Sequence, residues 1–577
     1  MPAPRVDSAT VFPKFLQRHA MLCWAALIGL AGAFTTVAFR DSLVALQWLI
    51  LGHPSSYVAM AQALSPLARV ALPTLGGLIA GILLLAAQRS ARQTHPADYM
   101  EAIASGTGAL SVRQTLLRSL SSLCTIGSGG SIGREGAMVQ MAATAASAIG
   151  RGQRFAPLKL RLLVACGAAA GISGAYNAPL ASAFFVCEIV LGSIVMETFG
   201  PILIAAVVTN LIMRSLPGYH PLYEMPAFAP VPNREVVLFV LLGVLSGALA
   251  PQFLRGIAYA RAGFRKIPAP LPVVMGLGGL AVGLISLWVP AVWGNGYSVV
   301  SSLLKTQWAP QAIMVVLLCK IIATSMTVGS GATGGIFTPT LFVGAAVGAL
   351  FGAALHQFLP QVATVESAFA VVGMGAFLAA TSGAPLMAIL MIFEMTASYQ
   401  IVMPLMLACT MAYFAARTAA GSTMYEITMK RRVNESARMR LRETVMADLV
   451  KPTDTVVQPT ASPHQMRELF NHHPVKYLYV VDNAGLFEGV VALQDLSNLG
   501  TEHDRDPLCC AQSMLRKNFL DFVTPDMPLA DAMQIFVRHQ GERLPVVASR
   551  AHPVFMGVVW KTSLLEAYFE LGRSDAA

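Results

Sequence analysis

Long stretches without a charged side chain dominate the first 430 residues. Such stretches run from His19 to Phe39, Val70 to Gln88, Val236 to Leu254 and Gly276 to Leu304. A helix needs roughly 20 apolar residues to cross the hydrocarbon core of a bilayer, so each stretch predicts a membrane-spanning helix. A water-soluble all-α protein is the alternative, and stretches of this length argue against it.

The longest charge-free stretch, residues 321–365, predicts a break in the chain at membrane depth. As a single helix these 45 residues would extend about 67 Å, twice the thickness of the hydrocarbon core. The Gly-rich segment from Gly329 to Pro339 is where we expect the interruption. Irregular backbone at that depth must line protein or a water-filled cavity, because lipid offers it no hydrogen bonds.

Charge divides the chain into two parts. Hydrophobic residues make up 55% of the sequence and charged residues 12%, about half the share usual in globular proteins. Residues 446–577 hold 11 Lys and Arg against 16 Asp and Glu, whereas residues 1–445 hold 29 against 14. We therefore expect an apolar, basic body and a soluble, mildly acidic tail.

The expected organisation follows from these changes in composition. A basic run after the last apolar stretch places the tail in the cytoplasm, since basic residues mark the cytoplasmic side of a span; it comprises Lys430, Arg431, Arg432, Arg438, Arg440 and Arg442. Nucleic-acid binding is improbable for a basic run in this position. The first apolar stretch does not resemble a cleavable signal peptide, and the eight cysteines show no metal-ligand or disulfide spacing. The expected parts are an N-terminal tail at 1–15, a membrane body at 16–430, a basic linker at 431–447 and a tail domain at 448–577.

The body repeats itself in two places. A first glycine motif, Gly-Ser-Gly-Gly-Ser-Ile-Gly at 127–133, returns as a second glycine motif, Gly-Ser-Gly-Ala-Thr-Gly-Gly at 329–335, an offset of 202. Ala-Pro-Leu at 178–180 returns at 384–386, and in both copies a glutamate, Glu188 or Glu394, lies ten residues after the alanine. Ordered matches of this kind indicate two related halves, with binding sites expected at their interface near mid-membrane. The halves are about 16–225 and 226–430. A symmetric structural role is expected for Glu188 and Glu394.

The glycine motifs favour an anion as the transported ion. A helix that starts inside the membrane presents unpaired N–H groups and the positive end of its dipole, and glycine lets an ion approach the backbone closely. Glu135 follows the first motif. An ionisable group at mid-membrane costs roughly 2.5–3.5 kcal/mol, which indicates a functional role. A carboxylate would compete with the anion for the same N–H groups, so Glu135 is a candidate gate and proton carrier; a capping or structural carboxylate is the alternative.

At these residues the sequence resembles the CLC family of chloride channels and chloride/proton exchangers. Gly133-Arg134-Glu135-Gly136 looks like the gating-glutamate motif of that family, with Ala137 where proline is common. Gly335-Ile336-Phe337-Thr338-Pro339 is similar to its second anion motif. Tyr425 stands where the family keeps a tyrosine whose hydroxyl helps to hold the central anion, although an aromatic residue at the membrane interface is the alternative.

The resemblance implies the fold and the assembly. The fold would be an all-α polytopic membrane protein with a CLC-type inverted repeat and broken helices, followed by an α/β tail. The protein would be a multi-pass component of the plasma (inner) membrane and a homodimer with one pore per subunit. Anion contacts would come from the two glycine motifs, at Gly133 and Gly335, and from the backbone N–H groups of Arg134, Glu135, Gly136, Ile336 and Phe337.

Two departures from the family pattern affect the expected activity. The Gly-Ser-Gly motif with the central serine is replaced by residues 94–99, in which Pro96 is the best match for the serine, so selectivity among anions stays open. Exchangers typically carry an inner proton-relay glutamate directly after the residue that matches Glu188, and this chain has Ile189 there. An isoleucine cannot hold a proton, which favours a channel over an exchanger.

The tail changes to short β-like runs between helical segments and looks like a tandem pair of CBS domains, at about 448–500 and 514–572. Gly489 and Gly557 mark equivalent positions, at an offset of 68. Asp495 matches a position that commonly contacts ribose, so the resemblance would allow an adenosine nucleotide as cofactor. The default expectation is a purely structural, dimerising role without a cofactor.

Together these features predict a chloride channel of the CLC type with a protonatable glutamate gate, and no enzymatic activity. A chloride/proton antiporter of the same family is the first alternative. A divalent-cation transporter would need a cluster of membrane Asp and Glu residues, which the sequence does not show. A membrane-anchored nucleotide sensor without transport activity is the remaining alternative.

Overall fold

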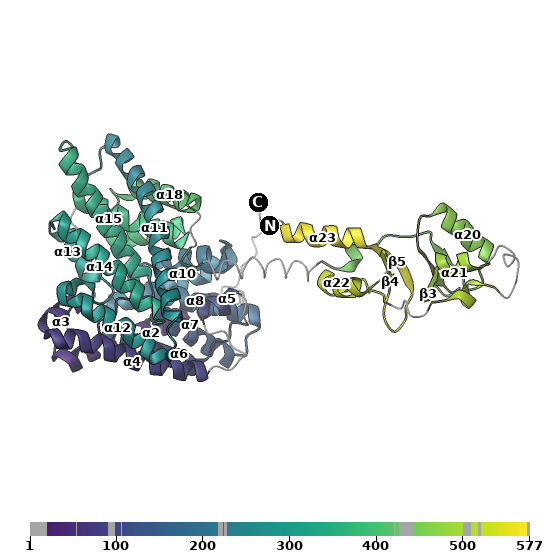
Figure 1. Cartoon of the computed structure of the whole chain (residues 1–577), viewed down its shortest axis with the longest axis horizontal. Coiled ribbons are helices and arrows are strands. Elements are labelled where there is room, and N and C mark those ends of the chain that lie inside the picture. Colours follow the sequence, from purple (N-terminus) through teal and green to yellow (C-terminus); the bar gives the residue numbers. More distant parts are fainter. Residues whose placement is uncertain are drawn as a thin grey trace, which may run out of the picture. The chain divides into compact units, whose positions relative to one another are not determined.

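A computed structural model describes most of the chain, in the ranges 20–53, 55–90, 98–104, 107–216, 223, 228–419, 423–425, 444–499, 509–516, 521–539 and 541–573. The chain divides into two compact units, Met1–Met429 and Lys430–Ala577, here called the membrane unit and the tail unit. The expected N-terminal tail, Pro96 and most of the basic linker lie outside the described residues. Figure 1 shows a bundle of helices for the first unit and helices with short strands for the second.

Eight described helical segments of the membrane unit are long and apolar enough to cross a bilayer. They are α2 (Ala20–Leu51), α4 (Pro66–Arg89), α8 (Pro157–Tyr176), α10 (Met196–Ser215), α11 (Val236–Arg265) with the 3-10 turn Asn233–Glu235 before it, α12 (Leu271–Trp288), α14 (Pro310–Gly329) and α15 (Phe337–Phe358). The sequence prediction of a polytopic, mainly helical membrane unit is confirmed.

Shorter helices fill the spaces between these spans. They are α3 (Tyr57–Ala63), α5 (Tyr99–Ala104), α6 (Val112–Gly127), α7 (Glu135–Gly152), α9 (Pro179–Phe185) with the π-helical turn Val186–Leu191, α13 (Tyr297–Lys305) after the 3-10 turn Pro290–Val292, α16 (Glu366–Ser382), α17 (Pro385–Thr396) and α18 (Val402–Thr418). The predicted break in the stretch 321–365 is confirmed, because α14 ends at Gly329 and α15 begins at Phe337. The helices that follow the two glycine motifs are α7 and α15.

The Ala-Pro-Leu repeats start a short helix in each half. Asn177 and Gly383 have left-handed backbone conformations, with φ of 56° and 72°, and end α8 and α16. The next helices, α9 and α17, then begin with Pro179 and Pro385, whose missing N–H would have no partner at that position anyway. The two halves therefore share a sharp turn between consecutive helices.

The glutamates of the repeat cap the helix of the opposite half. The Glu394 carboxylate accepts hydrogen bonds from the Leu180 and Ala181 N–H groups of α9, at 3.0 and 2.8 Å. The Glu188 carboxylate accepts from the Leu386 and Met387 N–H groups of α17, at 3.4 and 2.8 Å. Each carboxylate satisfies N–H groups that the first helical turn leaves unpaired and meets the positive end of the helix dipole. This exchange is the symmetric structural role expected from the sequence.

The tail unit contains two α–β–β–α modules with matching registers. The first has α20 (Pro463–His472), β2 (Tyr477–Val481), β3 (Phe487–Ala492) and α21 (Leu493–Asn498), with β1 (Val456–Val457) parallel to β2. The second has α22 (Leu529–Arg538), β4 (Arg543–Val547), β5 (Phe555–Trp560) and α23 (Lys561–Arg573), and two 3-10 turns, Met446–Asp448 and Ala511–Met514, complete the unit. In both antiparallel pairs the second strand contributes the glycine of the repeat, Gly489 opposite Val480 and Gly557 opposite Val546, and the register shifts at the next residue.

The beginning of the tail unit packs on its second module. Met446 is fully buried in the apolar core that includes Phe536 and Leu544. Lys451 exchanges two backbone hydrogen bonds with Val558 of β5, each 2.9 Å long. The segment that precedes the first module in the sequence is therefore part of the second module in space.

We expect Glu394→Ala to destabilise the membrane unit by about 2 kcal/mol, because two N–H groups at the start of α9 lose a charged acceptor. The repeat-equivalent change, Glu188→Ala, should have a similar effect at α17. The thermal unfolding midpoint of purified protein in detergent, followed by loss of the monodisperse species, measures both.

Glu197→Ala serves as the matched control, since Glu197 is an exposed glutamate in the first turn of α10. Its midpoint should stay at the wild-type value. Equal midpoints for Glu394→Ala and the control would contradict a capping role.

Candidate functional site

The two glycine motifs meet inside the membrane unit. The Gly133 N–H donates to the Gly335 carbonyl at 2.8 Å, and the Gly335 N–H donates to the Gly133 carbonyl at 3.0 Å. One motif connects α6 to α7 and the other connects α14 to α15, so the amino ends of α7 and α15 begin beside the same pair of glycines. The arrangement is the one that the repeat predicts, with two helices that start at a shared point.

Each motif is held by the helix that precedes the other motif. Ser131 of the first motif donates its N–H to the Thr327 hydroxyl at 3.2 Å and shares a hydroxyl hydrogen bond of 3.0 Å with Thr324 on α14. Thr333 of the second motif, which is equivalent to Ser131 by the offset of 202, donates its hydroxyl to the Arg118 carbonyl of α6 at 3.3 Å. The loops are therefore fixed by bonds that cross between the two halves.

Gly129 shows why the first motif needs glycine. Its φ is 101°, in the left-handed region that residues with a side chain rarely adopt. A Cβ at this position would also stand 2.5 Å from two ring atoms of the buried Trp293. The left-handed backbone and the close packing on Trp293 therefore both require glycine at position 129.

Glu135 is the first residue of α7, and its carboxylate lies at the amino end of α15. The side chain is buried, and it accepts hydrogen bonds from the Thr338 N–H and the Thr338 hydroxyl, both at 3.2 Å. Thr338 is the second residue of α15, where the backbone N–H has no partner within the helix. A Cβ on Gly133 or Gly335 would overlap this carboxylate, so the paired glycines make the space that it fills.

A second hydroxyl supports this contact. The Tyr176 hydroxyl lies 3.0 Å from the Thr338 hydroxyl oxygen, and the Tyr176 ring packs on Phe337 with centroids 4.9 Å apart. The sequence alone does not single out Thr338 or Tyr176, because apolar surroundings make each resemble an ordinary buried residue. The available signal is their position, since Thr338 lies in the motif Gly-Ile-Phe-Thr-Pro and Tyr176 lies two residues before the first Ala-Pro-Leu segment.

A small cavity adjoins the carboxylate. Its volume is about 10 Å³, close to the minimum that holds one water molecule. It is lined by Arg134, Glu135, Ala175, Tyr176, Asn295, Tyr297 and Thr338. The space beside the carboxylate is therefore large enough for about one water molecule.

The other predicted anion contacts gather at the same place. Ile336 caps α15, Phe337 is its buried first residue, and Gly136 lies against Gly334 of the second motif. Tyr425 packs edge-on against Phe185, with ring centroids 5.6 Å apart, and its hydroxyl lies within electrostatic range of the Glu135 carboxylate. The structure thus brings together all the predicted positions that it describes in the membrane unit, and Pro96 lies outside the described residues.

Ile189 occupies the position where an exchanger would carry its inner glutamate. It lies buried in the π-helical turn after α9. Its neighbour Glu188 is engaged in the cap of α17. Ile189 has no carboxylate, and the carboxylate of Glu188 is already hydrogen-bonded to α17.

In the tail unit, Asp495 forms a two-pronged ion pair. Its two carboxylate oxygens accept hydrogen bonds from the Arg516 Nε and Nη2 atoms, both at 2.6 Å. The contact raises the pKa of the Arg516 guanidinium above its ordinary value, because the bonds favour its charged form. A ribose at Asp495 would have to compete with this arginine.

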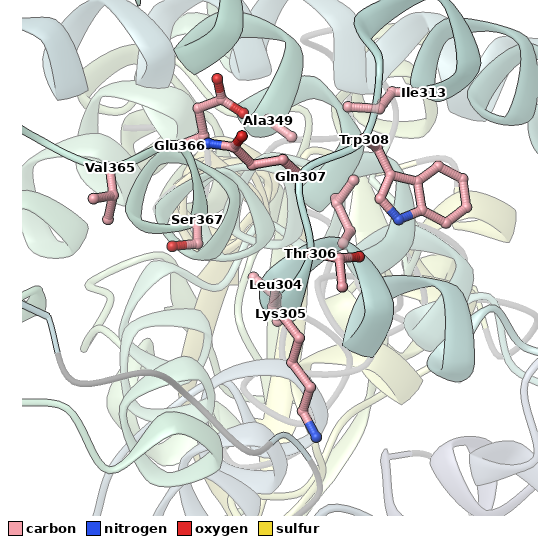
Figure 2. A pocket seen from close by; sticks show the side chains of 11 residues that line it. Leu304, Lys305, Thr306, Gln307, Trp308, Ile313, Ala349, Val365, Glu366 and Ser367 are labelled. Atoms are coloured by element: carbon pink, nitrogen blue, oxygen red, sulfur yellow. The ribbon is translucent and has the colours of Figure 1, made fainter.

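A separate pocket lies where α13, α14, α15 and α16 approach one another, and it holds no residue of either glycine motif. Its volume is about 450 Å³. Figure 2 shows its lining side chains, among them Lys305, Gln307, Trp308 and Glu366. Glu366 also lies 3.5 Å from the Nδ1 atom of His356.

Comparison with known proteins identifies the family. The profile of a family described as voltage gated chloride channel matches residues 76–417, and the CBS domain profile matches residues 512–569. A ClcB-like chloride channel protein of Ralstonia nicotianae is 51% identical over 423 residues, which are 73% of this chain and 99% of the relative. The voltage-gated ClC-type chloride channel ClcB of Escherichia coli is 42% identical over 409 residues, 70% of this chain and 96% of the relative.

A solved structure shares the fold of the membrane unit. The crystal structure of a slow cyanobacterial Cl⁻/H⁺ antiporter aligns with a TM-score of 0.62 at 25% identity, covering 71% of this chain and 97% of the antiporter. The similar proteins thus include both channels and an antiporter by name.

We expect Gly129→Ala to destabilise the membrane unit by about 2–4 kcal/mol, because the alanine is strained at φ of 101° and displaces Trp293. The measurement is the thermal unfolding midpoint in detergent. Gly152→Ala is the control, since a Cβ at Gly152 meets no atom within 4 Å. If both variants melt with the wild type, the close packing described for Gly129 is wrong.

Proposed function

Because the chain is a member of the CLC family of voltage-gated chloride channels and carries a CBS domain, we propose that it is an anion channel with Glu135 as its gate. Membership makes it a multi-pass membrane protein that transports chloride, and a transport protein rather than an enzyme. The divalent-cation transporter and the nucleotide sensor considered from the sequence gain no support from these matches.

One observation carries the proposal for the gate. The Glu135 carboxylate occupies the amino end of α15, between the paired glycines, where a free anion would find the same N–H groups and the same helix dipole. The Glu135 carboxylate fills the space between Gly133 and Gly335, so a chloride ion cannot enter that space at the same time. The ionised side chain in this position therefore excludes the anion.

Protonation provides the way to open the site. A neutral carboxylic acid gains little from the helix dipole and leaves the N–H groups to an incoming anion. In the open state we propose that the anion is held by backbone N–H groups of Arg134, Glu135, Gly136, Ile336 and Phe337, by the Tyr425 hydroxyl, and by the segment around Pro96.

A chloride/proton antiporter is the second candidate. The antiporter structure that shares this fold favours it, because its name records coupled proton movement in a relative. Ile189 argues for the channel, since a relay through this position would need a group that carries a proton. Water in the path is the remaining route for a coupled proton.

The assembly and the tail complete the proposal. By resemblance to the family we propose a homodimer with one pore per subunit in the plasma membrane, with the tail in the cytoplasm. The paired modules of the tail are proposed to serve mainly in assembly. Nucleotide binding would require an adenosine ribose to replace Arg516 at Asp495.

Glu135→Gln is expected to remove the pH dependence of chloride efflux from liposomes that contain the purified protein. Glutamine cannot ionise, so the variant resembles the protonated gate at every pH, and efflux at neutral pH should rise to the level that the wild type reaches in acid. A chloride electrode outside the liposomes records the flux.

Glu366→Gln is the matched control, because Glu366 is also the first residue of a membrane-unit helix but lies in the separate pocket of Figure 2. It should keep the wild-type pH profile. A Glu135→Gln protein whose efflux still rises in acid would show that another group is the gate.

A chloride gradient should drive no uphill proton movement if the protein is a channel. Liposomes loaded with chloride and placed in weakly buffered medium test this with a pH electrode and a potassium ionophore that sets the voltage. Proton uptake against its gradient, abolished in Glu135→Gln, would assign the antiporter instead.

A further inference from the structure

Three buried polar side chains form a chain that ends at the proposed gate. The relative exposures of Glu135, Thr338 and Tyr176 are 7%, 5% and 4%. They come from three different helices, α7, α15 and α8. The Thr338 hydroxyl lies in the middle, 3.2 Å from a Glu135 carboxylate oxygen and 3.0 Å from the Tyr176 hydroxyl.

The direction of these hydrogen bonds follows from the number of protons. Each hydroxyl carries one proton to donate, and an ionised carboxylate can only accept. The Thr338 hydroxyl donates to Glu135, so the Tyr176 hydroxyl must be the donor to Thr338. Both protons then point towards the carboxylate, and such chains strengthen the bond at their charged end.

We propose that Thr338 and Tyr176 are positioning residues that latch the ionised Glu135 side chain in its closed position. The latch rests on the proposed role of Glu135 as gate and adds the groups that set how firmly the gate is held. Any residue except proline at position 338 would supply the backbone N–H, so the hydroxyl is the part of the contact that belongs to threonine. The charge of the carboxylate makes the latch selective, because a protonated acid is a much weaker acceptor.

The surroundings keep the latch in place. The Tyr176 ring packs against Phe337, and the left-handed Asn177 ends α8 directly after it, so the tyrosine hydroxyl has a fixed position. Thr338 is held as the second residue of α15, in the first turn of that helix. Neither hydroxyl needs to move for the carboxylate to leave.

The other groups around Glu135 do not duplicate this contact. Arg134 precedes it on the same chain, and the neighbouring tyrosines within electrostatic range are Tyr99, Tyr176, Tyr223 and Tyr425. Among the described residues, the hydrogen bonds recorded from a side-chain donor to the Glu135 carboxylate come from Thr338 alone. Removing that hydroxyl should therefore be visible in the gate.

Thr338→Val tests the latch, since valine keeps the shape of threonine and lacks the donor. Hydrogen bonds to an ionised group favour that form, so their loss favours the protonated, open gate. The midpoint of the pH activation of chloride efflux should move by about one unit towards higher pH, with roughly tenfold more efflux at the pH where the wild type is mostly closed. Tyr176→Phe should give a smaller shift in the same direction.

Two further variants separate a latch from a general loss of packing. Thr338→Ser restores the hydroxyl without the methyl group and should return the midpoint to the wild-type value. In the Glu135→Gln background, Thr338→Val should have no effect on pH dependence, because the carboxylate that it acts on is absent. Size-exclusion profiles in detergent show which variants are folded. If Thr338→Val is not folded, Tyr176→Phe and Thr338→Ser together still test the latch.

Clear results would overturn the proposal. An unchanged midpoint in folded Thr338→Val and Tyr176→Phe, with pH dependence still lost in Glu135→Gln, would leave the gate in place and remove the latch. Loss of efflux at every pH in folded Thr338→Val would assign the hydroxyl to the anion instead of the gate. If Glu135→Gln itself kept the pH profile, the proposed gate would fail, and the latch with it.

Discussion

The hydrogen bonds between Gly133 and Gly335 are the contact on which the rest of the membrane unit depends. Two broken helices leave unpaired backbone groups at a depth where lipid can satisfy none of them. Pairing the two breaks with each other satisfies one donor and one acceptor on each side, and it aims the free N–H groups of α7 and α15 at a single point. The glycines also leave room there for one carboxylate or one small anion. Support for the loops, the position of Glu135 and the adjoining cavity all follow from this arrangement.

Much of this site could be predicted from the sequence, because an internal repeat indicates that equivalent segments of the two halves lie close together at their interface. The two glycine motifs and the two Ala-Pro-Leu segments recur in the same order at nearly the same offset, 202 and 206 residues, which indicates that both halves bring equivalent turns to one place, and the structure confirms this. Helix length predicts that the stretch 321–365 is broken, and the Gly-rich segment from Gly329 to Pro339 predicts where. The function of Glu135 as a gate remains a proposal, supported by where its carboxylate lies.

Other features could not be predicted, for identifiable physical reasons. Thr338 and Tyr176 lie 162 residues apart in the sequence, and their hydrogen bond depends on how the end of α8 packs against the start of α15, which no local sequence pattern encodes. The symmetric role of Glu188 and Glu394 is visible in the sequence, whereas the exchange of partners between halves is not. In the tail, the return of Met446 to the second module depends on an apolar core built by residues far downstream. The match of Asp495 to a ribose-contacting position likewise cannot reveal that its carboxylate is already paired with Arg516.

The crossed capping by Glu188 and Glu394 has a consequence for the stability of each half. In a single half, the acid would lack helix N–H groups to accept from, and the short proline-led helix would lack its anion. Two half-length chains facing each other across a two-fold axis would each complete the other. Each half therefore depends on the other for the start of its short helix, so a half made alone should be stable only as a pair.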